Sequence, residues 1–218
     1  MHFPSLAHHV VSAQSSAPLR VAYQGIAGAF SEAAVERAFG PQSSAVPCHT
    51  FGDVLDTLLD GQAEHAVLPI WNSTIGSVAG ACAAIDARAA AIVQERTLDV
   101  DIRLCLLGRP GATRDGLRFV GSHPAALAQC ARLFADRTLV ACDAYDTAGA
   151  ACELACFGDP AIMPRWYDDL DVREPSTLGA IASAAAADRY GLTILARDVH
   201  DRAGNHTRFA VLRAAVTS

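Results

Sequence analysis

Hydrophobic and polar residues follow two different periods along this chain of 218 residues. Short apolar runs, typical of buried strands, stand at 19–23, 66–70, 117–120, 139–142, 193–196 and 208–213. Amphipathic or alanine-rich segments between them predict helices at 32–39, 51–59, 77–87, 148–156 and 178–190. From residue 98 to 106 every second residue is apolar, as on half-buried strands. Strands that alternate with helices predict an α/β fold with largely parallel sheets.

Two changes of pattern predict that this fold is divided into two lobes. The change near residue 97 and the return of a buried strand near residue 193 indicate a first lobe from 19–96 plus 192–218 and a second from 97–191. Residues 1–18 are predicted to be a disordered leader, and 157–177, which contain three prolines, a long loop or surface excursion. Because α/β folds bind ligands at the carboxyl ends of strands and between lobes, we expect a cleft there.

The composition narrows the class of protein. Hydrophobic residues make up 51% of the chain and charged residues 18%, which excludes disorder, and no apolar stretch approaches the roughly 18–20 residues of a membrane span. We expect a cytoplasmic chain whose seven cysteines are buried free thiols, since no CxxC pair occurs. All 17 basic residues are arginine, which excludes Schiff-base and Walker-type lysine chemistry. The net charge of −6 argues against a nucleic-acid partner.

Polar clusters stand where strands pass into helices. Asn72–Thr74 follows a strand, and Ser122–Pro124 and Asp146–Thr147 begin helices. Hydroxyl, amide and free backbone N–H groups suit an anion, although ordinary helix caps use the same residues. The turn Gly25–Ala29 lacks the third glycine of a dinucleotide fingerprint, and Ser31 is predicted to cap the helix that follows. An anionic ligand must therefore be held by such junctions or by an arginine.

Six collinear segments between Val21 and Leu212 carry a specific resemblance: VAYQGIAGAFSEAA, VLPIWNSTIGSV, GSHPAALAQC, DTAGAA, AIASAAAADRYGL and GNHTRFAVL. In this order they resemble the successive signatures of the prephenate dehydratase domain. The resemblance implies two α/β lobes like those of a periplasmic binding protein, with prephenate in the cleft between them. It also implies the decarboxylative dehydration of prephenate to phenylpyruvate in phenylalanine biosynthesis, without a cofactor, by a homodimer that has no nucleic-acid or membrane partner.

The resemblance also implies roles for individual residues. Thr207 is similar to the family's essential threonine, Arg208 to its partner in anion binding and Phe209 to the residue that positions them. The other predicted substrate-binding residues are Asn72, Ser73, Thr74, Ser122, His123, Thr147, Gly25, Gly28 and Ala29. A guanidinium binds a carboxylate through two parallel hydrogen bonds, so Arg208 is expected to clamp substrate if it faces the cleft. Thr207 is expected to donate a hydrogen bond to the departing ring hydroxyl.

Three departures from the family pattern leave alternatives open. Trp71 stands where the family usually has glutamate, and 157–177 include an insertion that could be a lid or an oligomer contact. The sequence ends at Ser218 without a phenylalanine-sensing ACT domain, so we expect activity that is insensitive to phenylalanine. A prephenate decarboxylase, an arogenate dehydratase and a non-catalytic binding module remain alternatives, although an intact Thr207 favours dehydration. His200 and His206 have no metal-ligand spacing, so no metal site is predicted.

Overall fold

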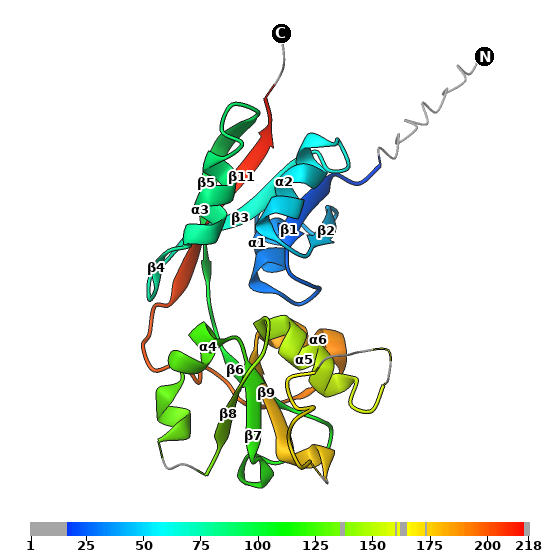
Figure 1. The fold of residues 1–218 in the computed structure, drawn as a ribbon, viewed down its shortest axis with the longest axis vertical. Coiled ribbons are helices and arrows are strands. Elements are labelled where there is room, and N and C mark those ends of the chain that lie inside the picture. The colour runs from blue at the N-terminus through cyan, green and yellow to red at the C-terminus, as the bar shows by residue number, and fades with distance from the viewer. Residues whose placement is uncertain (1–16, 136–137, 160, 162–164, 173, 216–218) are drawn as a thin grey trace, which may run out of the picture.

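Strands from both ends of the chain meet in one sheet, while the middle of the chain builds a second (Figure 1). β1 (Arg20–Gln24) and the last strand, β11 (His206–Ala214), both belong to the first sheet. The predicted architecture of two α/β lobes is thus confirmed. The computed structural model describes residues 17–135, 138–159, 161, 165–172 and 174–215, so the predicted leader lies outside the described residues up to residue 16.

The first lobe is a six-stranded sheet with helices on both faces. The strands lie in the order β2 (Ser44–Cys48), β1, β3 (His65–Asn72), β11 and β5 (Ile92–Asp101), with β4 (Gly76–Ser77) beside β3. β1, β2 and β3 are parallel, whereas β11 is antiparallel to β3 and β5. Side chains of a strand alternate between faces, so one set packs under α1 (Phe30–Phe39) and the other under α2 (Phe51–Leu59) and α3 (Ala79–Asp86).

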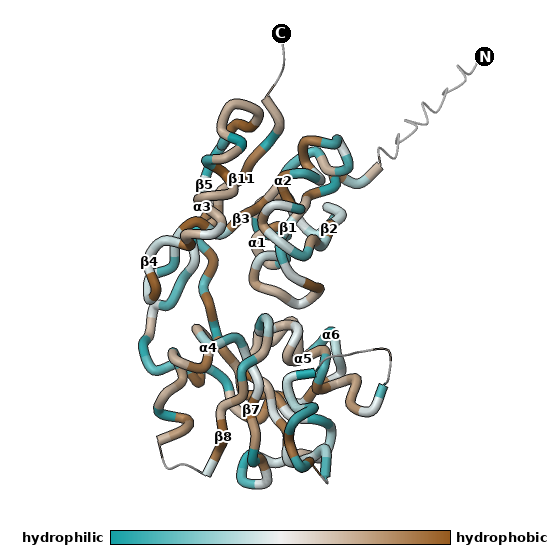
Figure 2. Tube along the Cα trace, in the orientation of Figure 1, coloured by the Kyte–Doolittle hydropathy of each residue, from teal (hydrophilic) through white to brown (hydrophobic). Residues whose placement is uncertain are grey.

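The second lobe has a five-stranded sheet in the order β10 (Thr193–Ala196), β6 (Cys105–Gly108), β9 (Leu178–Ala182), β7 (Phe119–Ser122) and β8 (Val140–Asp143). Its helices are α4 (Pro124–Ala128), α5 (Thr147–Ala155) and α6 (Ala184–Tyr190), with single 3₁₀ turns at Arg114–Gly116, Ala131–Phe134 and Pro175–Thr177. In this lobe, strands such as β7 contain hydrophobic residues, whereas several loops are hydrophilic (Figure 2). In the described part of the chain, no helix has the length and apolar character needed to cross a membrane.

The lobe boundaries differ from those predicted. β5 pairs with β11 as far as Asp101, so the first lobe extends beyond residue 96, and β10 pairs with β6, so the second lobe extends to Ala196. The two connections between the sheets are therefore residues 102–104 and 197–205. The alternation of apolar residues from 98 to 106 runs through strands of both sheets. A period of two identifies strands but does not say which sheet each one joins.

The start of α1 and the segment before α6 also correct predictions. α1 begins at Phe30 after Ala29, which provides no side-chain cap, so Ser31 lies inside the helix instead of capping it. The predicted helix 178–190 is the strand β9 followed by α6, which Ser183 caps by accepting the Ala186 N–H at 2.9 Å. Every residue of β9 is buried. A strand buried on both faces has no alternation to distinguish it from an alanine-rich helix.

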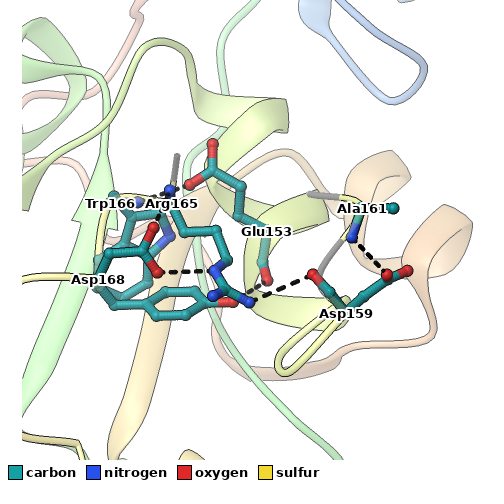
Figure 3. Close-up of polar contacts among 7 residues, drawn as sticks. Glu153, Asp159, Ala161, Arg165, Trp166 and Asp168 are labelled. Atoms are coloured by element: carbon teal, nitrogen blue, oxygen red, sulfur yellow. Dashed lines mark hydrogen bonds and ion pairs between the residues drawn. The ribbon is translucent and has the colours of Figure 1, made fainter. Parts of the chain in front are cut away.

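The described part of the predicted excursion, 157–177, is packed against α5 (Figure 3). Arg165 pairs with Asp168 at 2.8 Å, and the Trp166 backbone N–H donates to the Glu153 carboxylate at 2.8 Å. The Trp166 indole also donates to the Ala150 carbonyl and lies so close to β7 that a Cβ on Gly121 would come within 2.4 Å of the ring. This turn therefore belongs to the core of the second lobe.

The seven cysteines are all free, as predicted, but they are not all buried. Cys48, Cys105 and Cys130 are buried, and the other four are partly exposed. Burial raises the pKa of Cys130 to about 12, which keeps this thiol protonated and unreactive. The cysteines serve as small apolar residues in both lobes.

Candidate active site

A pocket of about 210 Å³ lies between the two lobes. Residues of α1, β3, β11 and the 102–104 connection line it from one side, and residues of α4 and α5 line it from the other. Its apolar wall includes Phe30, Ile102, Leu104 and Phe209. Its polar side chains are Ser31, Asn72, His123, Gln129, Asp146, Thr147 and Thr207. Five residues predicted from sequence thus meet in one pocket: the predicted catalytic residue Thr207 and the predicted substrate-binding residues Asn72, His123, Thr147 and Phe209.

Thr207 and Asn72 form the polar centre of this pocket. They lie opposite one another on the antiparallel strands β11 and β3, and the Asn72 amide donates a hydrogen bond to the Thr207 Oγ1 at 2.9 Å. Thr207 is only 8% exposed. Because its oxygen already accepts from an amide, the hydroxyl hydrogen must be donated elsewhere, and no acceptor for it is found among the described residues. The hydroxyl hydrogen is therefore not engaged by any acceptor among the described residues.

The orientation of the Asn72 amide is determined by its own partners. Its oxygen accepts the backbone N–H groups of Thr74 at 2.8 Å and Ile75 at 3.2 Å, so its nitrogen must face Thr207. That nitrogen also donates to the Asn205 side chain at 3.0 Å, and Asn205 donates in turn to Gln129 of the second lobe. The chain of hydrogen bonds Thr207–Asn72–Asn205–Gln129, the amide chain, connects the two lobes. Sequence reasoning missed Asn205 and Gln129, although both lie in the quoted segments GNHTRFAVL and GSHPAALAQC.

Ser73 and Thr74 support this centre from outside the pocket. The Ser73 hydroxyl accepts the His206 N–H at 3.0 Å and holds the turn that enters β11. The Thr74 hydroxyl lies 3.4 Å from the Asn205 side chain and donates to its oxygen. Thr74 also lines an adjoining pocket of about 300 Å³ that contains Arg202. Neither residue lines the pocket beside Thr207.

Arg208 does not face the pocket, which corrects its predicted role as a carboxylate clamp. Successive residues of a strand point to opposite faces, so Thr207 and Phe209 are buried while Arg208 is exposed. Its guanidinium binds Asp99 of β5 through two hydrogen bonds of 2.8 and 3.0 Å, which lower the pKa of the Asp99 carboxyl. Trp71 lies opposite Arg208 on β3, with the guanidinium 5.9 Å from its ring centre. The departure from the family pattern at residue 71 is thus on the outer face.

Two helix N-termini bring donors to the pocket. α1 has no side-chain cap and presents Phe30 and Ser31 there, so among the described residues no side chain caps the backbone N–H groups of its first turn. α5 presents Thr147, while the Asp146 carboxylate caps the helix by accepting the Gly149 N–H at 2.6 Å. Helix N-termini attract anions through their free N–H groups and the helix dipole. Ser31 was missed as a pocket residue because it was predicted to be a cap.

His123 contributes a third donor from α4. Its Nδ1 accepts the Ala125 N–H at 3.1 Å, so in the neutral ring the proton is on Nε2. The ring is exposed and lines the pocket. Within the described chain, no group of three or more His, Cys, Asp or Glu side chains is arranged to hold a metal ion.

The remaining predicted residues lie outside the pocket walls, and several of them brace the lobes. Ser122 is fully buried and donates to the Ile181 carbonyl at 2.7 Å, which ties β7 to β9. The carbonyl of Gly28 accepts the Ser183 hydroxyl of the second lobe at 2.7 Å, and a Cβ at residue 28 would lie 2.8 Å from the Ala186 Cα. The turn Gly25–Ala29 thus serves as a contact between lobes and as the entry to α1.

The chain is similar to proteins of a known family. The family model described as prephenate dehydratase matches residues 21–216. The chain belongs to the prephenate dehydratase family. Arogenate dehydratase 2 of Petunia hybrida is 39% identical over 194 residues, which are 89% of this chain and 44% of that protein. The chain therefore spans about half the length of the curated relatives it matches.

Two solved structures resemble the domain along most of its length. GqqA, described as a novel type of quorum quenching acylase, is 32% identical and has a TM-score of 0.75 over 91% of this chain and 65% of its own. Prephenate dehydratase from Arthrobacter aurescens, in complex with L-Phe, is 27% identical and has a TM-score of 0.73 over 91% of this chain and 61% of its own. These structures share with the chain the fold of two α/β lobes.

Proposed function

We infer that the protein catalyses the decarboxylative dehydration of prephenate or of its amino analogue arogenate, with Thr207 as the hydrogen-bond donor to the leaving hydroxyl. The observation that carries this inference is the hydrogen bond of 2.9 Å that the Asn72 amide donates to the Thr207 oxygen. The hydroxyl hydrogen is then available to a ligand in the pocket. The names of the relatives, among them arogenate dehydratase, support the same reaction.

The chemistry requires a donor more than a strong acid. When the ring carboxylate leaves as carbon dioxide, its electron pair enters the ring, and the ring becomes aromatic as the hydroxyl leaves from the opposite carbon. The departing oxygen gains negative charge and needs a proton to leave as water. A threonine hydroxyl is a weak acid, but aromatisation supplies much of the driving force. A positioned donor that stabilises developing charge is typically worth on the order of a hundredfold to a thousandfold in rate.

The carboxylates of the substrate have donors in the same pocket. The residues that can supply them line the pocket: Ser31 in the first turn of α1, Thr147 in the first turn of α5, and His123. Apolar residues such as Phe209 and Leu104 form a wall for the ring. Because such a wall excludes water, it lowers the local dielectric constant and strengthens each of these hydrogen bonds. Arg208, which pairs with Asp99 on the outer face, has no part in this scheme.

An acylase activity, named for one structural relative, is less well supported. Acyl transfer by a hydroxyl nucleophile needs a general base that accepts the hydroxyl proton. The nearest partner of the Thr207 oxygen is instead the donating amide of Asn72. This geometry favours Thr207 as a donor to a leaving group over Thr207 as a nucleophile.

Incubation of the purified protein with prephenate and, separately, with arogenate tests the proposal. We expect phenylpyruvate from prephenate or phenylalanine from arogenate, each identified by chromatography and absorbance. A keto or amino acid that has lost carbon dioxide but is not aromatic would instead indicate a decarboxylase. Binding of either compound without turnover would indicate a non-catalytic module. Any result in which no aromatic product forms contradicts the proposed function.

A further inference from the structure

Asp146 is an unexpected residue in a pocket that receives carboxylates. Among the described residues that line the pocket it is the one acid, and none of them is an arginine. One carboxylate oxygen of Asp146 accepts the Gly149 N–H at 2.6 Å, and the described residues include no ion-pair partner for the side chain. The same carboxylate borders an adjoining pocket that contains Glu153. This end of the cleft is therefore acidic.

A carboxylate at this place discriminates between the two candidate substrates. Prephenate carries two carboxylates and no cation, so its side chain would meet a like charge at Asp146. Arogenate has an amino group in the side chain, which is an ammonium at neutral pH and is attracted to a carboxylate. Like charges brought together in a partly desolvated pocket disfavour the wrong ligand, and opposite charges favour the right one.

The groups beside Asp146 complete a site for an α-amino acid. The backbone N–H of Thr147 and the uncapped first turn of α1 with Ser31 are donors for a carboxylate. Asp146 is an acceptor for an ammonium on the same carbon. Thr207 lies on a different element, β11, and is the donor assigned above to the ring hydroxyl.

We propose that Asp146 is the specificity-determining residue that selects the amino form, arogenate, over the keto form, prephenate. The proposal rests on the dehydratase function proposed above. Asp146 acts on the side-chain end of the substrate, so it affects the choice between substrates more than the chemical step at the ring. The wild-type protein therefore has a higher kcat/KM for arogenate than for prephenate.

The test is the ratio of kcat/KM for arogenate to kcat/KM for prephenate in wild-type protein and in Asp146→Asn and Asp146→Ser. Asn and Ser are both good N-cap residues, so α5 retains its cap in either variant. Loss of a hydrogen bond to a charged group is expected to lower this ratio roughly 10- to 100-fold in both variants. Asp53→Asn, which removes a carboxylate from the capping box of α2, is the matched control and should leave the ratio unchanged.

The outcomes separate this proposal from the proposed function. A wild-type preference for prephenate overturns the role of Asp146 while the dehydratase function stands. An unchanged ratio in both Asp146 variants, with both substrates still converted, has the same meaning. If wild-type protein forms an aromatic product neither from prephenate nor from arogenate, the proposed function itself is overturned, and the role of Asp146 with it. A lowered ratio in one or both variants, with Asp53→Asn unchanged, supports the proposal.

Discussion

Replacement of Thr207 by valine tests the centre of the proposed mechanism. Valine keeps the branched shape of threonine in β11 but replaces the hydroxyl by a methyl group. The change removes the acceptor of the 2.9 Å hydrogen bond from Asn72 and the donor that faces the pocket. If the hydroxyl assists the leaving group, kcat should fall about 100- to 1,000-fold, as for other single donors to developing charge.

The cost to folding is expected to be much smaller than the cost to catalysis. The Asn72 amide keeps two other acceptors, the Asn205 side chain at 3.0 Å and the His206 carbonyl at 3.1 Å. A buried donor that loses its partner costs about 1–3 kcal/mol, and here the lower end applies because other acceptors remain. A protein of this size is typically stable by about 5–15 kcal/mol, so the variant should remain folded.

The assay compares kcat for aromatic product formation in wild-type protein, Thr207→Val and Thr207→Ser, with thermal unfolding of each. Serine keeps the hydroxyl and should keep most of the activity. Some loss is expected because serine lacks the methyl group that restricts rotation of the threonine side chain. A valine variant that retains kcat within about tenfold of wild type would refute the role of the hydroxyl. So would equal losses in the serine and valine variants when both are folded.

Three further predictions concern the frame around the pocket. Gly28→Ala should lower the free energy of unfolding in urea by about 1–3 kcal/mol more than Gly40→Ala. Both glycines have a positive φ, 87° at Gly28 and 83° at Gly40, but only a Cβ at residue 28 would contact Ala186. Equal losses in the two variants would contradict the contact between the lobes. Arg208→Ala should leave turnover close to wild type because the guanidinium faces away from the pocket; a loss like that of the valine variant would refute this placement. Burial raises the pKa of the Glu153 carboxyl, so the stability associated with its protonated form is present at acidic pH and is lost as pH rises through the folded-state pKa. Glu153→Gln should therefore raise the melting temperature near pH 7 and give no gain below about pH 4; an equal effect at both would contradict the assignment.

Local signals in the sequence determined those elements whose pattern lies in neighbouring residues, and they determined the family. The helix predicted at 51–59 is observed at the same residues, because a capping box and an amphipathic pattern are properties of neighbouring residues. The six quoted segments likewise depend only on order along the chain, and they led to the prephenate dehydratase family. Thr207 and Asn72 both lie in these segments, but the segments do not predict their contact.

The outer position of Arg208 follows from the period of two along a strand. Once 208–213 was predicted as a strand, the period of two already placed Thr207 and Arg208 on opposite faces. Their neighbours in the motif suggested a shared role instead. The structure adds the partner, Asp99 of β5, which no local pattern identifies.

Only the tertiary structure decided which distant groups meet. The hydrogen bonds from Asn72 to Asn205 and from Asn205 to Gln129 join residues 133 and 76 positions apart. The acidic character of the pocket at Asp146 depends on how α1 and α5 approach one another across the cleft. Periodicity and capping act over a few residues, whereas the pocket is made by the packing of two sheets. The sequence alone therefore determined the α/β class, most of the helices and the family, whereas the strand β9 inside the predicted helix 178–190 and the side chains that meet at one ligand were decided by the packing of the lobes.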